Sequence, residues 1–500
     1  MKKPRIAEPA KLKEAPRAKE PRAPFDRPRK LGAERNSKRT RAPEGNPAWD
    51  QVHAKAGHAN PASRLASLQP IRPSGQQSNR QLGAIVSRRA ADRLRAGSVW
   101  VYASDVESLE APKGGDVHPP ALLPVADGRG LLLGTALYSP TSQIALRLVS
   151  REALDEAGWL ELLSARLRRA VERRWEMLAG LKGESDSCRL CFSEADELPG
   201  LIVDKYGDLI VLQLLTKGLD SARVRETCVD VLGEAIAPKI IGTGSLAAIL
   251  ERPDPRIREL EGLSAPSTDP LWLANPAVKK TSTEFHLNGL TFHFDANSGQ
   301  KTGAFLDQHA NYAAAQRWAW LLAPGGRALD VCTYQGGFAL HLARVCKRVT
   351  GIDASHASLE VAERNLEANR AQLAAEVDWV EADAFELLRD WSNGRESFDT
   401  IVLDPPAFAK SKRAVEGALR GYKELNLRAL KMIRAGGLLV TCSCSHHVGW
   451  AELEGTVASA AADAGRRVRL LERRGAALDH PVILTLPETE YLKCLVLEVE

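Results

Sequence analysis

The sequence has 500 residues, 44% of them hydrophobic and 26% charged, which is typical of globular proteins and sufficient for about three domains. It contains no stretch of about 18 apolar residues, which argues against a membrane-spanning helix. The net charge of +5 hides an asymmetry, because residues 1–80 hold 19 Lys and Arg against 7 Asp and Glu, whereas the remaining residues hold 49 against 56.

The basic segment 1–80 also holds 11 of the 28 prolines and few aliphatic clusters. Such a composition cannot offset the entropy lost on ordering, so we predict a disordered tail. A basic tail can bind RNA phosphates in a salt-dependent way or can simply keep the protein in solution, and the sequence favours neither role. It lacks the continuous apolar segment of a signal peptide.

Eight cysteines in a chain of this length favour reduced thiols and a cytoplasmic location over a disulfide framework. Cys188 and Cys191 form a CxxC pair, but no second pair and no nearby histidine accompany them. We therefore predict structural thiols at these positions and no metal site.

Residues 81–151 are predicted to form a small β-barrel, because short candidate strands alternate there with glycine-containing turns. The candidate strands are Ala84–Val86, Trp100–Tyr102, Leu131–Ala136 and Ile144–Val149.

Residues 152–294 are predicted to form an α+β middle domain. Apolar residues recur at helical spacing among arginines over Glu152–Leu181, which indicates an amphipathic helix. Further elements are predicted as strands Gly200–Asp204 and Asp208–Leu215, a helix over 219–235, and a Pro-rich connector over Pro253–Pro276.

Residues 295–500 are predicted to form an α/β domain with a Rossmann-like, doubly wound parallel sheet, because strand and helix patterns alternate from Gly325 onward. The candidate strands are Arg327–Cys332, Arg348–Asp353, Val377–Glu381, Thr400–Leu403 and Gly437–Cys442.

A glycine loop follows the first of these strands. Gly336 and Gly337 permit a tight turn close to a ligand, but the spacing is not the GxGxxG of dinucleotide sites. Asp330, which precedes Cys332 and Thr333 in this segment, would repel a phosphate but could hold an ammonium group. A nucleoside with an amino-acid tail therefore suits the loop better than a dinucleotide, and NAD-dependent redox chemistry is disfavoured.

The next two strands also end in acids. Asp353 can accept hydrogen bonds from both hydroxyls of a ribose, and Asp383, followed by Ala384, is placed to meet an adenine amine. Three acids in order on successive strands favour a cofactor site at the carboxyl edge of the sheet.

The fourth strand ends in Asp404-Pro405-Pro406-Ala407-Phe408. Two prolines hold the backbone rigidly, so Asp404 and nearby carbonyls can grip the edge of a base while Phe408 stacks near its face. Pro405 is expected to border the cofactor and Pro406 the base.

The fifth strand ends in two thiols, Cys442 and Cys444. Alternation along a strand places both on one face, with Ser443 on the other. Cys444 is nearer the strand end, which favours it as a nucleophile, although a structural role for either thiol stays open.

The chain resembles the bacterial large-subunit (23S) ribosomal RNA cytosine-C5 methyltransferases that carry an N-terminal PUA domain, over about Gln81–Glu500. The motifs that carry this resemblance are Tyr138-Ser-Pro-Thr-Ser-Gln-Ile144, Leu198-Pro-Gly-Leu-Ile-Val-Asp-Lys-Tyr-Gly207, Lys301-Thr-Gly-Ala-Phe-Leu-Asp-Gln308, Asp404-Pro-Pro-Ala-Phe408, Arg420-Gly-Tyr-Lys423, Ser443-Cys-Ser445 and Asp479-His-Pro-Val482.

The resemblance implies that S-adenosylmethionine is the cofactor and that Cys444 attacks C6 of the base, with Asp404 at N3. It also implies that Phe305, Asp307 and Gln308 line the cofactor pocket. The sequence departs from the family pattern at Cys442, where an aromatic residue is usual, and at His446-His447, where small or apolar residues are usual.

Arg88, Arg89, Arg93 and Arg95 fit an RNA contact, although an arginine run is also typical of a solvated helix face. Two other functions stay open: methylation of a purine nitrogen without a covalent step, and RNA binding in ribosome assembly without catalysis. Self-association into a homodimer also stays open.

Overall fold

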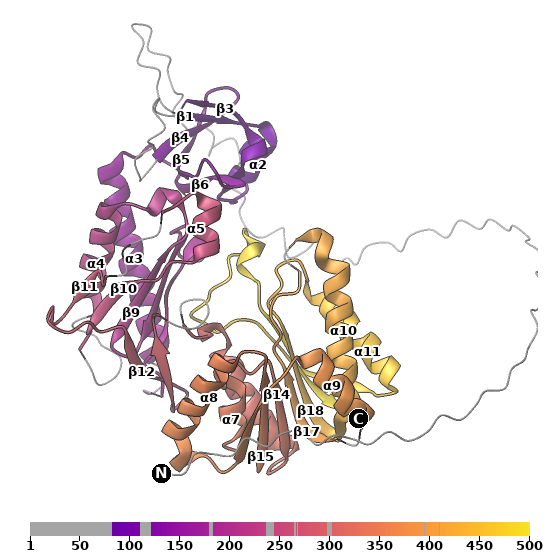
Figure 1. The fold of residues 1–500 in the computed structure, drawn as a ribbon. Coiled ribbons are helices and arrows are strands. Elements are labelled where there is room, and N and C mark those ends of the chain that lie inside the picture. The colour runs from indigo at the N-terminus through magenta and orange to yellow at the C-terminus, as the bar shows by residue number, and fades with distance from the viewer. Residues whose placement is uncertain are drawn as a thin grey trace, which may run out of the picture. The chain divides into compact units, whose positions relative to one another are not determined.

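The computed structural model describes residues 83–110, 122–179, 184–236, 245–264, 267, 269–297, 303–394, 396–409 and 411–500 (Figure 1). The predicted disordered tail lies outside these residues. Among the helices of the described ranges, none is both long and apolar enough to cross a membrane. The domain borders predicted after residues 80, 151 and 294 stay predictions.

A six-stranded sheet forms the first folded part and confirms the predicted small β-domain. Its strand order is β2-β6-β5-β4-β1-β3, and alternate strand residues such as Val125 and Leu146 pack into a common core. The helix α2 (Arg88–Arg95) also packs on this core through Leu94, and its N-terminus is capped by the Ser87 hydroxyl. The strands are β1 (Gly83–Val86), β2 (Trp100–Tyr102), β3 (Val106–Glu110), β4 (Leu122–Asp127), β5 (Leu132–Tyr138) and β6 (Ile144–Ser150).

The middle part is a five-stranded sheet in the order β11-β10-β9-β8-β7, with α3 (Glu156–Ala179) and α4 (Ala222–Ile236) packed on its core. Cys188 and Cys191 are buried free thiols in this core, as predicted. The strands are β7 (Cys188–Phe192), β8 (Leu201–Tyr206), β9 (Leu209–Leu214), β10 (Ala248–Glu251) and β11 (Trp272–Leu273).

The prediction of a plain connector over Pro253–Pro276 was wrong. This segment contains the helix α5 (Pro255–Glu261) and the strand β11. Pro255 stands in the first helical turn, where its missing N–H costs nothing, and the Asp254 carboxylate caps the N-terminus through the amide of Ile257 at 3.0 Å. The proline therefore starts a helix there rather than interrupting one.

A two-stranded hairpin that was not predicted from the sequence consists of β12 (Ser282–Leu287) and β13 (Leu290–Asp295). Its turn is Asn288-Gly289, and both residues have positive φ, of 52° and 76°. Asn-Gly is the turn sequence that two-residue hairpins prefer, so a local signal was present.

The C-terminal part is a seven-stranded sheet in the order β16-β15-β14-β17-β18-β20-β19, which confirms the Rossmann-like fold. The first five strands in this order are parallel, whereas β20 runs antiparallel to β18 and β19. The strands are β14 (Arg327–Val331), β15 (Arg348–Asp353), β16 (Glu376–Glu381), β17 (Phe398–Leu403), β18 (Ile433–Ser443), β19 (Val468–Arg474) and β20 (Lys493–Val499).

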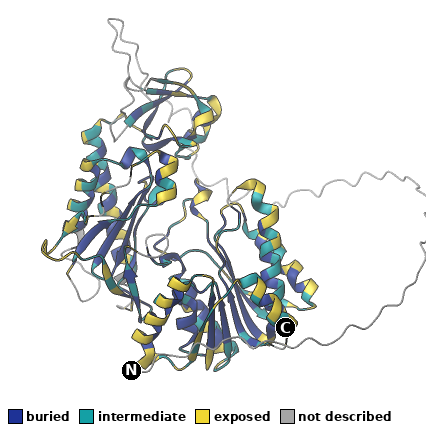
Figure 2. Ribbon diagram, viewed as in Figure 1, coloured by how far each residue is buried: buried dark blue, intermediate teal, exposed yellow. Residues whose placement is uncertain are grey.

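Helices cover both faces of this sheet, so its central strands are buried on both sides (Figures 1 and 2). One face packs against α6 (His309–Leu322) and α7 (Gly337–Leu342), and the other packs against α9 (Ala384–Asn393), α10 (Val415–Met432) and α11 (Trp450–Ala464). The helix α8 (His356–Asn369) connects β15 to β16. The parallel strands consequently end at one edge, where the predicted site residues gather.

Candidate active site

A cleft of about 690 Å³ lies at the carboxyl edge of the seven-stranded sheet. It brings together residues from the ends of β14, β15, β16 and β17, from the segment after β18, and from the segment before α6. The predicted residues that line it are Phe305, Asp307, Gln308, Cys332, Thr333, Gly337, Asp353, Asp383, Ala384, Asp404, Pro405, Pro406, Phe408 and Cys444.

The loop after β14 turns sharply. Cys332 and Tyr334 both adopt positive φ, of 63° and 52°, and Gly336 has a φ of 85°. Gly336 does not line the cleft, so its role is to turn the chain into α7. Gly337 does line it, and an added Cβ would lie 2.4 Å from the Tyr312 ring, so this glycine also allows Tyr312 to pack against the loop.

Asp330 lies beneath this loop and does not line the cleft, contrary to the sequence prediction. One carboxylate oxygen, Oδ2, accepts hydrogen bonds from the Thr333 hydroxyl at 2.5 Å and the Ala339 amide at 2.9 Å. The other, Oδ1, is buried without a partner among the described residues. Burial raises the pKa of Asp330 to about 7. Its carboxyl group therefore fixes the loop to α7, because the turn directs the strand-end side chain inward.

The other two strand-end acids do reach the cleft. Asp353 accepts hydrogen bonds from the amides of Tyr334 at 2.9 Å and Ser355 at 2.8 Å, so it also holds the glycine loop in place. Asp383 caps α9 by accepting from the amides of Phe385 and Glu386. A carboxylate oxygen can accept more than one hydrogen bond, so both acids can cap the backbone and still bind a ligand.

The segment before α6 forms the opposite wall. The rings of Phe305 and Tyr334 meet edge to face with centroids 4.9 Å apart. The Asp307 carboxylate accepts a hydrogen bond from the Tyr491 hydroxyl at 2.5 Å. Phe305, Asp307 and Gln308 all line the cleft, where the resemblance places them.

The Asp-Pro-Pro corner stands at the end of β17. The Asp404 amide donates to the Val331 carbonyl at 3.2 Å, which ties the corner to the central strand. The ring of Phe408 is half-buried, with ring centroids 4.8 Å from Tyr422 and 5.8 Å from Phe385. It therefore packs among aromatic rings of the protein and also lines the cleft, so its predicted stacking on the target base stays a prediction.

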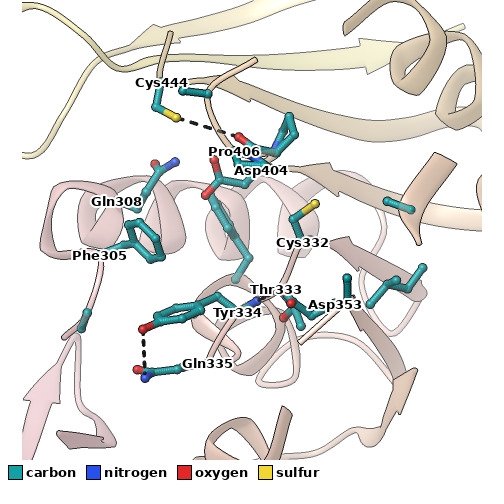
Figure 3. Close-up of a pocket in the computed structure, with 18 of the residues that line it drawn as sticks. Phe305, Gln308, Cys332, Thr333, Tyr334, Gln335, Asp353, Asp404, Pro406 and Cys444 are labelled. Carbon is teal, nitrogen blue, oxygen red and sulfur yellow. Dashed lines mark hydrogen bonds between the residues drawn. The ribbon is translucent and has the colours of Figure 1, made fainter. Parts of the chain in front are cut away.

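The structure separates the two thiols that the sequence placed on one face. Cys442 is fully buried and pairs in register with Cys494 of β20, inside the hydrophobic core. Cys444 lines the cleft, with its sulfur 3.9 Å from the Pro405 carbonyl oxygen (Figure 3). The strand β18 ends at Ser443, so Cys442 lies within the sheet whereas Cys444 lies beyond its end.

Two serines fix the position of Cys444. Ser443 donates a hydrogen bond to the Tyr422 hydroxyl at 2.9 Å, and that hydroxyl also lies 3.0 Å from the Ser445 hydroxyl. Ser445 in turn accepts from the Ala409 amide, just beyond the Asp-Pro-Pro corner. Sequence reasoning assigned Tyr422 no role, although the Arg-Gly-Tyr-Lys motif that contains this residue was a signal for it.

Comparison with known proteins identifies the family. Residues 84–151 match a PUA-like domain, and residues 262–481 match an S-adenosylmethionine-dependent methyltransferase. The chain is 36% identical over 411 residues to ribosomal RNA large subunit methyltransferase I of Pseudoalteromonas translucida, covering 81% of this chain and 96% of that protein. The chain belongs to the ribosomal RNA large subunit methyltransferase I family.

Other relatives agree. The protein of the same name from Erwinia tasmaniensis is 35% identical, with 79% of this chain and 93% of that protein covered. A SAM-dependent methyltransferase from Streptococcus mutans has the same fold, with a TM-score of 0.66 at 17% identity, covering 83% of this chain and all of that one. The protein is therefore an S-adenosylmethionine-dependent methyltransferase.

The cleft of this methyltransferase fits its cofactor. S-adenosylmethionine carries a sulfonium and an ammonium group, and among the lining residues four carboxylates, Asp307, Asp353, Asp383 and Asp404, face a single cationic side chain, Arg256. Opposite charges attract strongly in a partly desolvated cleft. The acids are thus better suited to a cationic nucleoside than to a phosphate, as the glycine spacing predicted.

The four arginines that the sequence suggested for an RNA contact all lie on α2, in the PUA-like domain of this protein. Arg88 has a side chain that is 95% exposed and lies 3.9 Å from the Asp92 carboxylate, and Arg89 is exposed. Arg93 pairs with Asp105 and Arg95 with Asp127, both at 2.5 Å and both in less exposed surroundings. None of the four lines the cleft. Arg88 and Arg89 therefore present their side chains to solvent, whereas Arg93 and Arg95 link α2 to Asp105 and Asp127 of the same domain.

Proposed function

We propose that this enzyme methylates C5 of a cytosine in large-subunit (23S) ribosomal RNA, with Cys444 as a covalent nucleophile. The single observation that carries the proposal is the position of Cys444, whose sulfur lines the cofactor cleft beside the Asp-Pro-Pro corner while Cys442 is buried. The curated relatives are named as methyltransferases of large-subunit ribosomal RNA, which supports the choice of substrate. The reaction would take place in the cytoplasm.

C5 of cytosine is a weak nucleophile, which is why the chemistry needs a thiolate. Attack of the Cys444 sulfur on C6 breaks the C5–C6 π bond and moves its electrons toward C5. Asp404, on the rigid corner, would hold N3, giving it a proton as Cys444 adds and taking the proton back when Cys444 leaves. S-adenosylmethionine supplies an electrophilic methyl group when bound. Water or a nearby side chain then removes the C5 proton, and the electron pair of that bond reforms the double bond as Cys444 leaves.

The residues around the cofactor take separate roles in this proposal. Asp353 would bind the ribose hydroxyls and Asp383, with Ala384, the adenine. The cleft residues that precede α6, together with the glycine loop, would enclose the amino-acid tail of the cofactor. Pro406 would border the target base. The base must be single-stranded or flipped from its helix at a cost of roughly a few kcal/mol, which Arg88 and Arg89 would help to offset by binding phosphates.

A covalent step can be trapped directly. Ribosomal RNA with 5-fluorocytosine should form an adduct that survives denaturing electrophoresis, because fluorine cannot leave C5 as the proton does. We expect the adduct with the wild type and with Cys442→Ala, and none with Cys444→Ala. Mass spectrometric mapping of ribosomal RNA from cells with and without the gene should show a lost 5-methylcytosine.

The main alternative predicts a different pair of results. An enzyme that methylates a purine nitrogen forms no bond to the base, so it would give no adduct and would stay active as Cys444→Ala. Loss of a methylated purine, with every 5-methylcytosine intact, would overturn the proposal.

A further inference from the structure

Lys493 is a buried cation next to the segment that carries Cys444. It is the first residue of β20 and pairs in register with Ser443. Only 3% of Lys493 is exposed, and its ammonium group donates hydrogen bonds to the carbonyls of Ser445 at 3.0 Å and Tyr491 at 3.1 Å. Burial of a lysine costs free energy unless hydrogen bonds and opposite charges stabilise its ammonium group, so a buried lysine beside the cleft suggests a functional role.

The charged groups around Lys493 come from several elements. Burial lowers the pKa of Lys493, whereas Glu490, Cys444 and Glu452 of α11 act in the opposite direction. The positive charge of Lys493 is also unfavourable for protonation of His446 and helps to lower the pKa of that histidine, after the larger effect of burial. The geometry agrees with this, because Lys493 pairs in register with Ser443 and its ammonium group bonds to the carbonyl of Ser445, so its charge lies beside the two neighbours of the cleft thiol Cys444.

Cys444 also has neighbours that do not favour its anion. The Pro405 carbonyl accepts from the thiol, which favours the protonated form, and the Tyr422 hydroxyl and the Asp404 carboxyl group belong to the same region. Lys493, in contrast, carries a positive charge beside this segment, and a nearby positive charge stabilises a thiolate.

We propose that the Lys493 ammonium stabilises the thiolate form of Cys444 and so activates the nucleophile of this enzyme. Lys493 is then a positioning residue, since it acts through Cys444 and does not touch the substrate. In the resting enzyme the thiol proton passes to solvent, and the sulfur keeps the electron pair that later forms the bond to C6. The same charge would stabilise the thiolate again when it leaves. The role in catalysis rests on the proposed function, but the electrostatic coupling does not.

Thiol alkylation measures this coupling without RNA. The full-length protein is treated with iodoacetamide from pH 6 to 10, and modification of the Cys444 peptide is quantified by mass spectrometry. In Lys493→Met we expect the midpoint of the Cys444 profile to rise by about one pH unit. At pH 7 the alkylation rate should fall about threefold, because a tenfold smaller thiolate fraction is partly offset by higher nucleophilicity.

A matched control is available elsewhere in the chain. Lys205 is also buried and donates to two carbonyls, those of Asp186 at 2.6 Å and Gly207 at 2.5 Å, in the middle part of the fold. Lys205→Met removes an equivalent lysine and should leave the Cys444 profile unchanged. Lys493→Arg keeps the charge and should preserve most of the effect. An identical profile in wild type and Lys493→Met would overturn the proposal.

The electrostatic effect acts in both directions, so Cys444 should also change the pKa of Lys493. This second measurement tests the proposal even if the Lys493→Met variant fails to fold. If the circular dichroism melt of Lys493→Met shows no folded state, the Lys493 side chain is titrated by ¹³C NMR in the wild type and in Cys444→Ser. We expect a lower Lys493 pKa in Cys444→Ser, because a hydroxyl cannot supply the negative charge, and equal values would refute the coupling. If the coupling is found but no adduct forms with RNA, the proposed function fails and this inference stands.

Discussion

The hydroxyl of Ser443 donates a hydrogen bond to the hydroxyl of Tyr422 at 2.9 Å, one residue before the thiol that lines the cofactor cleft. Because the same tyrosine hydroxyl also meets Ser445, the residues on both sides of Cys444 are tied to one fixed point on α10. The Ser-Cys-Ser motif thus serves to hold a thiol in place, and this has measurable consequences.

Removal of that fixed point should reduce catalysis more than cofactor binding. In Tyr422→Phe both serine hydroxyls lose a partner, so we expect a loss of about 1–3 kcal/mol in unfolding free energy. Displacement of Cys444 should lower kcat by on the order of tenfold with an unchanged Kd for S-adenosylmethionine. Steady-state kinetics and calorimetry measure the two effects. Tyr138→Phe, in the PUA-like domain, is the matched control, and an unchanged kcat in Tyr422→Phe would contradict this role.

The two thiols of the fifth strand should respond differently to alanine. Cys444→Ala should abolish methylation, whereas Cys442→Ala should keep its activity and lose about 1–2 kcal/mol of stability, because it leaves a small cavity beside Cys494. Methyl transfer to RNA and urea denaturation test the pair together. Equal loss of activity in both variants would argue against the separation that the structure shows.

The buried carboxyl group of Asp330 should make the free energy of unfolding depend on pH. Its pKa is raised to about 7 in the folded protein, whereas an unfolded aspartate titrates near 4. Between these values the folded state keeps a proton that the unfolded state releases, so this group lowers stability as pH rises, by about 1.4 kcal/mol for each unit. Above pH 7 the penalty is constant.

An asparagine at position 330 cannot ionise and removes this slope. Urea denaturation from pH 5 to 8 should therefore show that Asp330→Asn gains stability relative to the wild type up to about pH 7. A constant difference between the two proteins across that range would mean that the carboxyl group does not hold its proton.

The exposed arginines of α2 should contribute to RNA affinity and not to chemistry. In the double variant Arg88→Ala/Arg89→Ala we expect weaker binding, with the slope of log K against log salt reduced by about 0.7 to 0.9 for each phosphate that is no longer neutralised. The kcat at saturating RNA should not change. Arg348→Ala, at the amino end of β15 and away from the cleft edge, is the control. An unaltered salt slope would exclude α2 from the RNA interface.

Much of the fold was predictable because its signals are local. The five parallel strands were all predicted within a few residues, since short runs rich in apolar residues identify them without tertiary information, and four of these runs lead into acids. The pairing of β20 against β18 was missed because it joins segments about fifty residues apart, and the sequence of one strand does not identify its partner. The Asn-Gly hairpin was missed although its turn sequence was present.

The candidate site likewise has some features that local sequence predicts and others that only the tertiary structure decides. Local patterns were enough to predict which residues reach the carboxyl edge, because parallel strands end together, and they pointed to Asp353, Asp404 and Cys444 on that ground. The direction of each side chain, in contrast, depends on long-range packing. Asp330 turns inward beneath the loop, Phe408 packs among aromatic rings, and Cys442 is buried while Cys444 is not, because Cys442 lies within the sheet and Cys444 lies beyond its end. Lys493 came to the site through antiparallel pairing, a long-range contact that no local pattern encodes.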